Sequence, residues 1–402
     1  MFSLEKLVSI GFSIAQAIVL NKLFKRVGYA APFQKTDLVA EAVLPDNKII
    51  EINGIEGLKE IFKSSTQFYT DIETIFVQRG NADPWQGRVE TVVVYQVTEQ
   101  DAELSDGEEF VYDWASAVDN FVKVNANWAQ LVISSREPAS ILAAAKKANT
   151  NSRLFIGQCE DDTIAGAQEN NIAELLKGFN VDNALLFYHP DAEFISGGIA
   201  GILAQNQLGL TGPLFATVTN CQPQDYSDSI NDNLEKLNVA SYQYVNPVNG
   251  GGVQEYATPI VRPAKQVTGM DTKRQYTKFC IDLLLKAKAI NFLKRALTYE
   301  DISAKVLDSE LSSVLIELQR GDGAFKRLVK LDTTKSDGTV IKGFDLRVGR
   351  PSDLQDTQPT AYNTQTYPVV GYYRDALTGQ KIEISLNVDP NMSTLALLGF
   401  IE

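Results

Sequence analysis

A regular alternation of apolar strands and amphipathic helices, from about residue 47 to residue 247, constrains the fold of this chain most strongly. Nearly continuous β-branched runs such as VETVVVYQV (89–97) are typical of strands covered on both faces. Strand followed by helix, repeated this often, predicts right-handed crossovers and a mostly parallel sheet. The expected strands are 47–52, 89–97, 128–134, 152–159, 183–189, 214–220 and 241–247. The expected helices are 54–62, 68–77, 108–122, 138–148, 163–179, one from about 193, and 227–238.

The pattern changes beyond Pro263, where two long helical segments (272–297 and 302–321) precede three strand-like segments (341–348, 367–374 and 381–388). DALTGQ (375–380) reads as a hairpin turn between the last two strands. The predicted fold class is a mostly parallel α/β sheet domain followed by a helical/β (α+β) C-terminal domain, with strand-forming terminal arms. The expected boundaries are an N-terminal arm and linker (1–44), the α/β domain (45–262) and the C-terminal domain with its arm (263–402).

Charge, cysteine content and hydropathy exclude several classes of protein. The net charge of −13 argues against generic binding to nucleic acid or to anionic membranes. The three scattered cysteines, Cys159, Cys221 and Cys280, indicate free thiols rather than a disulfide or zinc framework. The apolar run 7–20 has 14 residues, short of the ~20 that span a bilayer. It reads as a buried or partner-bound segment, with a cleaved signal peptide as the alternative.

The stretch GGIAGILAQNQLGLTG (197–212) raises the question of a phosphate-binding loop. A dinucleotide fingerprint needs GxGxxG directly after a strand, whereas the spacing here is GGxxG and no Gly-Lys-Ser/Thr follows. The interpretation we favour is a helix face of small residues packed closely on the sheet.

Acidic residues follow the predicted strands and converge on one rim if the sheet is parallel: Glu99, Asp101, Glu137, Glu160, Asp161, Asp162 and Asp191. They could chelate Mg²⁺, but acids in these positions also cap helices, and capping is the stronger reading. His189 is the only histidine, and no GxSxG motif accompanies it. Arg136 is the only base among these rim residues. We therefore expect no catalytic, cofactor or metal site.

A basic segment interrupts the acidic chain. Between Arg262 and Lys330 there are 14 Lys/Arg against 8 Asp/Glu. The predicted helix 272–297 contains one acid, Asp282, and seven bases. The bases are Lys273, Arg274, Lys278, Lys286, Lys288, Lys294 and Arg295. Such a helix could bind nucleic acid, a membrane surface or an acidic protein, or be a solvated face. A separate basic pole on an acidic protein suits self-assembly around an acidic partner.

The order of several segments resembles the contractile tail sheath proteins of phages and related injection systems. ISGGIAGILAQNQLGLTGP (195–213) resembles the family's Ala-Gly helix and glycine turn. TGMDTKRQYTKFCIDLLLKAKAINFL (268–293) resembles its helix after a Gly-x-Asp turn, and EGLKEIFKSSTQFYTDIETIFVQ (56–78) its entry into the sheet. LFATVTNCQPQDYSDSINDNLEKLNVASYQYVNP (214–247) is similar to its strand, helix and extended segment. The resemblance spans most of the chain from about residue 45.

The resemblance implies a non-enzymatic structural subunit of the virion tail, assembled in the host cytoplasm. Such subunits form stacked sixfold rings around a tail tube and contract to drive the tube through a host envelope. Expected partners are further copies, the tube protein, and baseplate and tail terminator proteins, with no nucleic acid, cofactor or membrane insertion. The seven bases listed above are expected to face the tube. Terminal arms are expected to donate strands to neighbours through Leu7, Val8, Ile10, Phe12, Ile382, Ile384, Leu386 and Val388. The alternatives are a nucleotide- or Mg-dependent α/β enzyme and another structural tail or baseplate protein.

Overall fold

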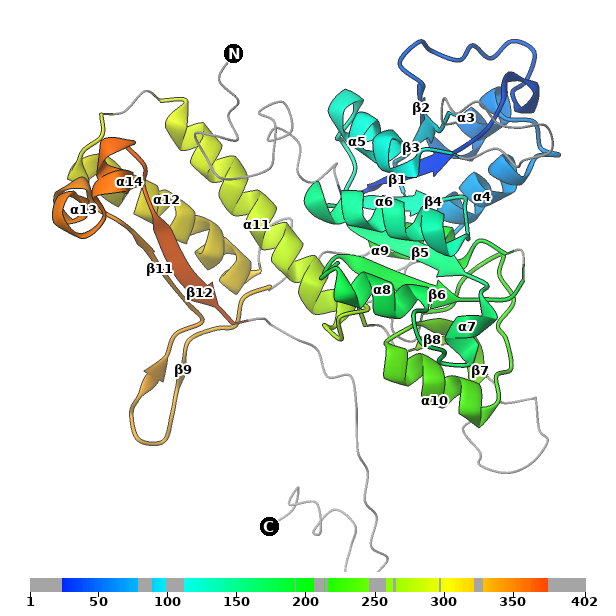
Figure 1. Cartoon of the computed structure of the whole chain (residues 1–402). Coiled ribbons are helices and arrows are strands. Elements are labelled where there is room, and N and C mark those ends of the chain that lie inside the picture. Colours follow the sequence, from blue (N-terminus) through cyan, green and yellow to red (C-terminus); the bar gives the residue numbers. More distant parts are fainter. Residues whose placement is uncertain are drawn as a thin grey trace, which may run out of the picture.

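The computed structural model describes residues 24–78, 89–98, 112–191, 193–205, 213, 216–245, 258–262, 265–295, 298–321 and 328–374. Its two lobes are joined by a long helix, α11 (Thr272–Leu293) (Figure 1). The larger lobe contains the described residues before α11, and the smaller lobe contains the described residues after it. No helix among the described residues has the length and apolar character to cross a membrane.

A six-stranded sheet forms the centre of the larger lobe, in the order β2-β3-β1-β4-β5-β6. The strands are β1 (Arg26–Ala31), β2 (Ile49–Ile52), β3 (Thr91–Gln96), β4 (Gln130–Ile133), β5 (Leu154–Cys159) and β6 (Ala184–Tyr188). All neighbours are parallel except β2, which runs antiparallel to β3 at the edge. The predicted mostly parallel α/β fold is therefore confirmed.

Helices cover both faces of this sheet because its strands present apolar side chains on both sides. Val92 and Val94 of β3 belong to the core shared with α3 (Gly54–Ile61), α4 (Gln67–Phe76) and α9 (Ile195–Gln205). Val93 and Tyr95 belong to the core shared with α5 (Trp114–Val124), α6 (Pro138–Thr150) and α8 (Ile172–Gly178). The result is a three-layer arrangement.

Strand β1 lies within the segment that the sequence analysis assigned to the N-terminal arm and linker. It pairs with β3 on one side and β4 on the other, so residues 26–31 belong to the centre of the sheet. The strand is short and contains Gly28, against which the Trp128 ring packs so closely that a Cβ would lie 2.7 Å from it. The boundary at residue 44 is wrong for this segment, because a small-residue strand gives little apolar pattern.

Two other expectations are corrected. The predicted helix 163–179 is two helices, α7 (Asp162–Ala165) and α8, because Ala167 and Asn170 have positive φ and Asn171 caps α8 through the Glu174 N–H. The predicted strand 214–220 is not a strand over its described residues 216–220. There the Gln78 side chain accepts from the Thr219 N–H and donates to the Thr219 carbonyl, at 2.9 and 2.8 Å, in place of a neighbouring strand.

Beyond β6 the chain forms α10 (Asp228–Leu237) and the antiparallel pair β7 (Ser241–Val245) and β8 (Thr258–Arg262). The smaller lobe contains α12 (Asp301–Arg320), α13 (Pro351–Thr357), α14 (Pro359–Asn363) and two antiparallel ribbons. One ribbon is β9 (Thr333–Thr334) with β10 (Val340–Ile341), and the other is β11 (Phe344–Val348) with β12 (Val369–Tyr373). The predicted 375–380 turn and 381–388 strand lie outside the described residues.

Candidate functional site

The glycines of the 197–212 stretch serve packing. Gly197, Gly198 and Gly201 lie in the first turns of α9, and a Cβ on Gly201 would lie 2.3 Å from the carbonyl oxygen of Ile75 in α4. A Cβ on Gly198 would lie 2.3 Å from a methyl group of Val218. The small-residue interpretation is confirmed, but the partners of these glycines are α4 and the 216–220 segment rather than the sheet. Residues 206–212 lie outside the described part of the chain.

The described acidic residues at the carboxyl end of the sheet each have a local partner, and one of them, Asp161, caps a helix. The Asp161 carboxylate accepts from the Thr163 N–H at 2.9 Å at the start of α7. Glu137 precedes α6 and accepts from the Ser140 hydroxyl at 3.2 Å. Glu99 and Asp101 lie outside the described residues. The cap predicted for these acids is therefore present at Asp161, and the side chain of Glu137 bonds to Ser140 instead of capping α6.

His189 forms the only described grouping in which three potential metal ligands approach one another. Its ligand atom and those of Asp191 and Glu193 lie within 4.8 Å of each other. The ring is fully buried, and its Nε2 lies 3.1 Å from the Gln222 carbonyl oxygen and 3.7 Å from Glu193 Oε2. A carbonyl oxygen only accepts, so this Nε2 carries a proton and is not a metal ligand.

The two carboxylates beside His189 already have donors. Glu193 accepts from the Gln222 N–H at 2.8 Å, and Asp191 accepts from the Gln224 side-chain amide. The cluster can therefore hold the β6–α9 turn against residues 222–224, and the buried His189 Nδ1 is left without a hydrogen-bond partner among the described residues.

Arg136 closes the same network from the end of β4. Its guanidinium donates to the backbone carbonyls of Asp191 and Glu193, at 2.5 and 3.1 Å, and lies 3.6 Å from the Glu160 carboxylate. In parallel α/β sheets the carboxyl edge is where ligands usually bind. In this chain Arg136, the one cation predicted at this edge, donates to main-chain oxygens of the neighbouring turn.

A buried carboxylate, Asp71 of α4, lies close to this edge and was not foreseen from the sequence. Its Oδ2 accepts from the Tyr29 hydroxyl and its Oδ1 from the Gln67 amide, both at 2.7 Å. Burial raises the pKa of Asp71 to about 6, although both hydrogen bonds and the charge of Arg136 act in the opposite direction. Burial and the neighbouring Asp71 also raise the pKa of Tyr29. The signal in the sequence was an aspartate beside Ile72 on the apolar face of an amphipathic helix.

The predicted basic helix exists as α11, but its described cations do not form a single face. Arg274 and Lys278 lie near one end, and Lys288, Lys294 and Arg295 lie near or just beyond the other. The ten residues from 278 to 288 rise about 15 Å along the axis, and the fully buried Ile281 lies between them. Arg295 pairs with Glu310 of α12. The side chains of Lys273 and Lys286, and all eight predicted arm residues, lie outside the described part.

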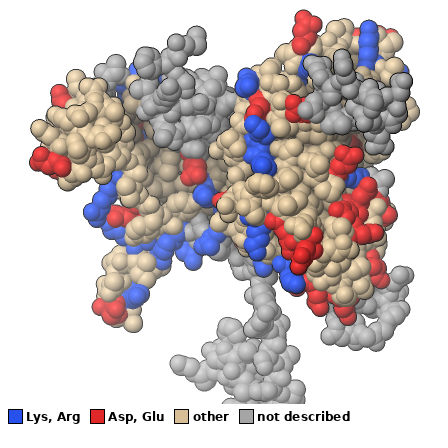
Figure 2. Space-filling view, in the orientation of Figure 1, with Lys and Arg blue, Asp and Glu red and all other residues tan. Residues whose placement is uncertain are grey.

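Both lobes carry acidic and basic side chains, but each has one region where a single sign gathers (Figure 2). Acidic side chains gather on the larger lobe where α7 and α10 lie, and basic side chains gather on the underside of the smaller lobe.

Comparison with known proteins identifies the fold. No family model and no curated protein matches this chain. Among solved structures it is similar to the crystal structure of the sheath tail protein from Desulfitobacterium hafniense, with a TM-score of 0.50 and 10% sequence identity. The match covers 87% of this chain and 96% of that protein. At this identity the likeness shows the fold alone. The chain has a sheath-like fold.

Proposed function

We propose that this protein is a structural subunit of a contractile tail sheath. It would polymerise into stacked sixfold rings around a tail tube and contract to drive the tube through a host envelope, without enzymatic activity. The observation that carries the proposal is the sheath-like fold, which spans both lobes and nearly the whole length of the similar protein. The order of sequence segments supports it independently. Most described polar groups of the carboxyl edge bond to one another, and this arrangement gives the rival enzyme function no specific support.

The proposal requires a place where a neighbour's terminal arm adds a strand, and β12 is suited to that role. Among the described residues it pairs with β11 alone, and Val370 and Tyr372 are 73% and 54% exposed. Gly349 donates to the Pro368 carbonyl and Arg374 donates to the Gly343 carbonyl. Even-numbered positions of β12 therefore bond to β11, and Val369 and Gly371 direct their backbone groups to the open edge.

An exposed apolar edge of this kind is an aggregation hazard unless another strand covers it. We infer that the arms bearing Leu7, Val8, Ile10 and Phe12 or Ile382, Ile384, Leu386 and Val388 of adjacent subunits pair there. Backbone pairing would keep subunits connected while their lobes rotate during contraction.

The tube would be contacted by cations of the α11 region, and the described candidates are Arg274, Lys278, Lys288, Lys294 and Arg295. Because these side chains lie at two separate ends, we expect two patches of contact rather than one continuous strip. Baseplate and terminator proteins would bind the ends of the stack.

Negative-stain microscopy of the purified protein with its tube protein tests the function directly, and rings or tubes of regular repeat are expected. Val369→Pro removes one N–H from the open edge of β12, while Val369→Ala keeps it as a matched control. Ordered tubes are expected with alanine but not with proline. A protein that stays monomeric with and without the tube protein would contradict the sheath function.

A thermal-shift screen with nucleotides and Mg²⁺ tests the rival enzyme. A saturable rise in melting temperature would favour that alternative.

A further inference from the structure

The β9–β10 hairpin projects from the smaller lobe and contributes little to its core (Figure 1). Every residue from 331 to 340 is exposed, including Leu331 at 47% and Val340 at 58%. Leu331 and Val340 therefore add exposed apolar surface to a projection that is otherwise polar. The hairpin is therefore a candidate interaction element.

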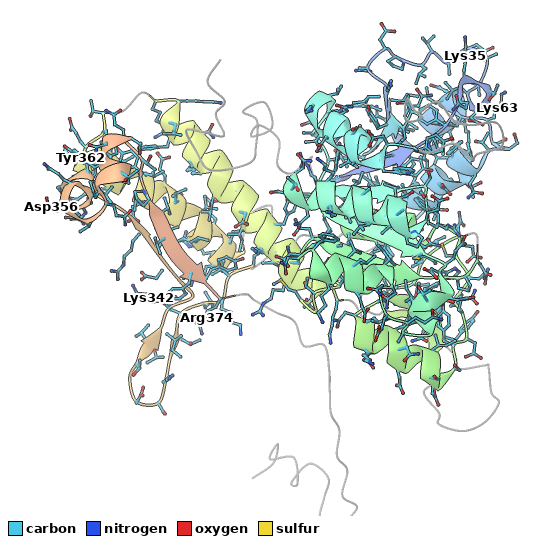
Figure 3. The ribbon with its side chains drawn as sticks, viewed as in Figure 1. Lys35, Lys63, Lys342, Asp356, Tyr362 and Arg374 are labelled. Carbon is cyan, nitrogen blue, oxygen red and sulfur yellow. The ribbon has the colours of Figure 1, made fainter. Side chains whose placement is uncertain are left out.

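The base of the hairpin is held firmly although its surface is exposed. The Arg374 guanidinium donates to the carbonyls of Leu331, Ile341 and Lys342, at 2.9, 3.0 and 2.9 Å, and so joins both strands to the end of β12. Figure 3 shows Arg374 and Lys342 together at this base. The Asp332 carboxylate adds a second clamp, accepting from the Gly343 N–H at 2.7 Å and from Gln319 at 2.9 Å.

The tip is also preorganised. Lys335 donates its N–H to the Thr339 carbonyl at 2.9 Å, and Gly338, with φ of 83°, donates to the Lys335 carbonyl at 3.0 Å. The Asp337 carboxylate accepts from the Thr339 N–H at 2.9 Å. A projection fixed at both base and tip loses little conformational entropy when it binds, which favours recognition.

The charge of the hairpin indicates its partner. Lys330, Lys335 and Lys342 are exposed, against Asp332 and Asp337, and Lys342 also pairs with Asp345 at 3.3 Å, so the hairpin carries a small excess of positive charge. The described surface of opposite charge lies on the larger lobe, where Asn233 of α10 donates to the Ala165 carbonyl of α7 and joins the two helices. On this surface Lys236 is the one exposed base among the described residues. The exposed acids are Asp162, Glu169, Asp225, Asp228, Asp232 and Glu235 (Figure 2). Asp232 and Glu235 lie on the same side of α10, beyond its first turn.

We propose that the β9–β10 hairpin of one copy docks on the acidic surface formed by α7 and α10 of a second copy. The inference rests on the proposed self-assembly and identifies two surfaces that carry it. The two surfaces differ, so the contact is heterologous and continues from copy to copy into a ring or a filament. Complementary charge sets the register of the contact and makes it sensitive to salt.

Paired charge reversals test the contact. Lys330→Glu with Lys335→Glu reverses the hairpin, and Asp232→Lys with Glu235→Lys reverses the acidic surface. Lys35→Glu with Lys59→Glu is the matched control, because it changes the same charge at exposed sites of the larger lobe far from both surfaces (Figure 3 labels Lys35). Self-association is measured by sedimentation velocity at about 0.1 M salt, and assembly by negative-stain microscopy with the tube protein. Circular dichroism and melting temperature verify the fold of each variant.

Each reversed surface alone should weaken self-association at least about tenfold, while the control should stay within about twofold of the wild type. The variant with both surfaces reversed should recover to within about threefold of the wild type, because the opposite charges face each other again. If the wild type forms tubes and the hairpin variants assemble equally well, this contact is wrong, but the sheath function still stands. Failure of the doubly reversed variant to recover would also overturn it. A wild type that never associates would overturn both.

Discussion

Asp71 makes the stability of the larger lobe depend on pH in the direction opposite to most carboxylates. The buried group has a pKa of about 6 in the folded chain, against an ordinary value of 3.8. Between these values the folded state binds more protons than the unfolded state, so the free energy of unfolding falls as pH rises from about 4 to about 6. The two pKa values differ by about two units, and each unit corresponds to about 1.4 kcal/mol. By neutral pH the free energy of unfolding has therefore fallen by about 3 kcal/mol relative to its value at low pH.

Asp71→Asn removes the charge and keeps the size of the side chain. Its amide oxygen can accept from the Tyr29 hydroxyl, and Gln67 can turn its own amide oxygen toward the new NH₂ group. We expect the variant to be more stable than the wild type by about 1–3 kcal/mol at pH 7.5, and the difference to shrink by about that amount on acidification to pH 4. The measurement is urea unfolding of both proteins across this pH range.

The difference between the two proteins isolates Asp71, because all other titrating groups are common to both. Asp113→Asn provides a control of opposite sign. Hydrogen bonds from Ser116 hold the pKa of Asp113 below its usual range, so its stabilising effect is present at neutral pH and lost as pH falls. A stability difference between Asp71→Asn and the wild type that stays constant from pH 4 to pH 7.5 would refute the reasoning.

Three further predictions concern packing and the carboxyl edge. Gly201→Ala should destabilise the chain by about 1–3 kcal/mol, since the new Cβ meets the Ile75 backbone, whereas Gly57→Ala, whose nearest neighbour is at 3.9 Å, should be neutral or gain up to about 1 kcal/mol. Both are measured by urea unfolding, and equal effects would contradict the close contact. Gln78→Ala should raise amide hydrogen exchange over residues 216–224 at least about tenfold, and unchanged protection there would show that Gln78 does not hold the segment. Mg²⁺ and Zn²⁺ should shift the melting temperature of wild type and His189→Gln equally, because the His189 Nε2 already donates to Gln222, and a shift specific to the wild type would restore the metal hypothesis.

The sequence allowed most of the larger lobe to be predicted because its pattern is local. The β-branched run that became β3 and the helix opened by Pro138 each carry their own signal. Strand β1 carries no such local signal. Gly28 and the alanines of RVGYAA form a strand because Trp128 packs over Gly28 and because β3 and β4 pair with it on either side. The break between α7 and α8 depends on two residues with positive φ that no hydrophobic period reveals.

In the candidate site, too, local patterns were predictable from the sequence, and contacts between residues far apart in the chain were not. That the glycines of α9 allow a close approach was predictable from their spacing, but their contact with Ile75 joins residues far apart in the chain. Asp71 was hidden for the same reason, because a single acid on an apolar helix face gains meaning only when Tyr29 and Gln67 are found opposite it.

The way the carboxyl edge is closed bears on where function must lie. An enzyme of this architecture keeps donors at that edge directed at a ligand. In this chain the Arg136 donors end on the backbone of residues 191 and 193, the proton on His189 Nε2 ends on Gln222, and the Glu193 carboxylate is held by the Gln222 N–H. Such a network stabilises one arrangement of these turns. The described features directed outward are the open edge of β12 and the clamped β9–β10 hairpin, and both present backbone or charge suited to another protein chain. This distribution of satisfied and exposed groups supports the proposal that the chain functions through contacts with other protein chains.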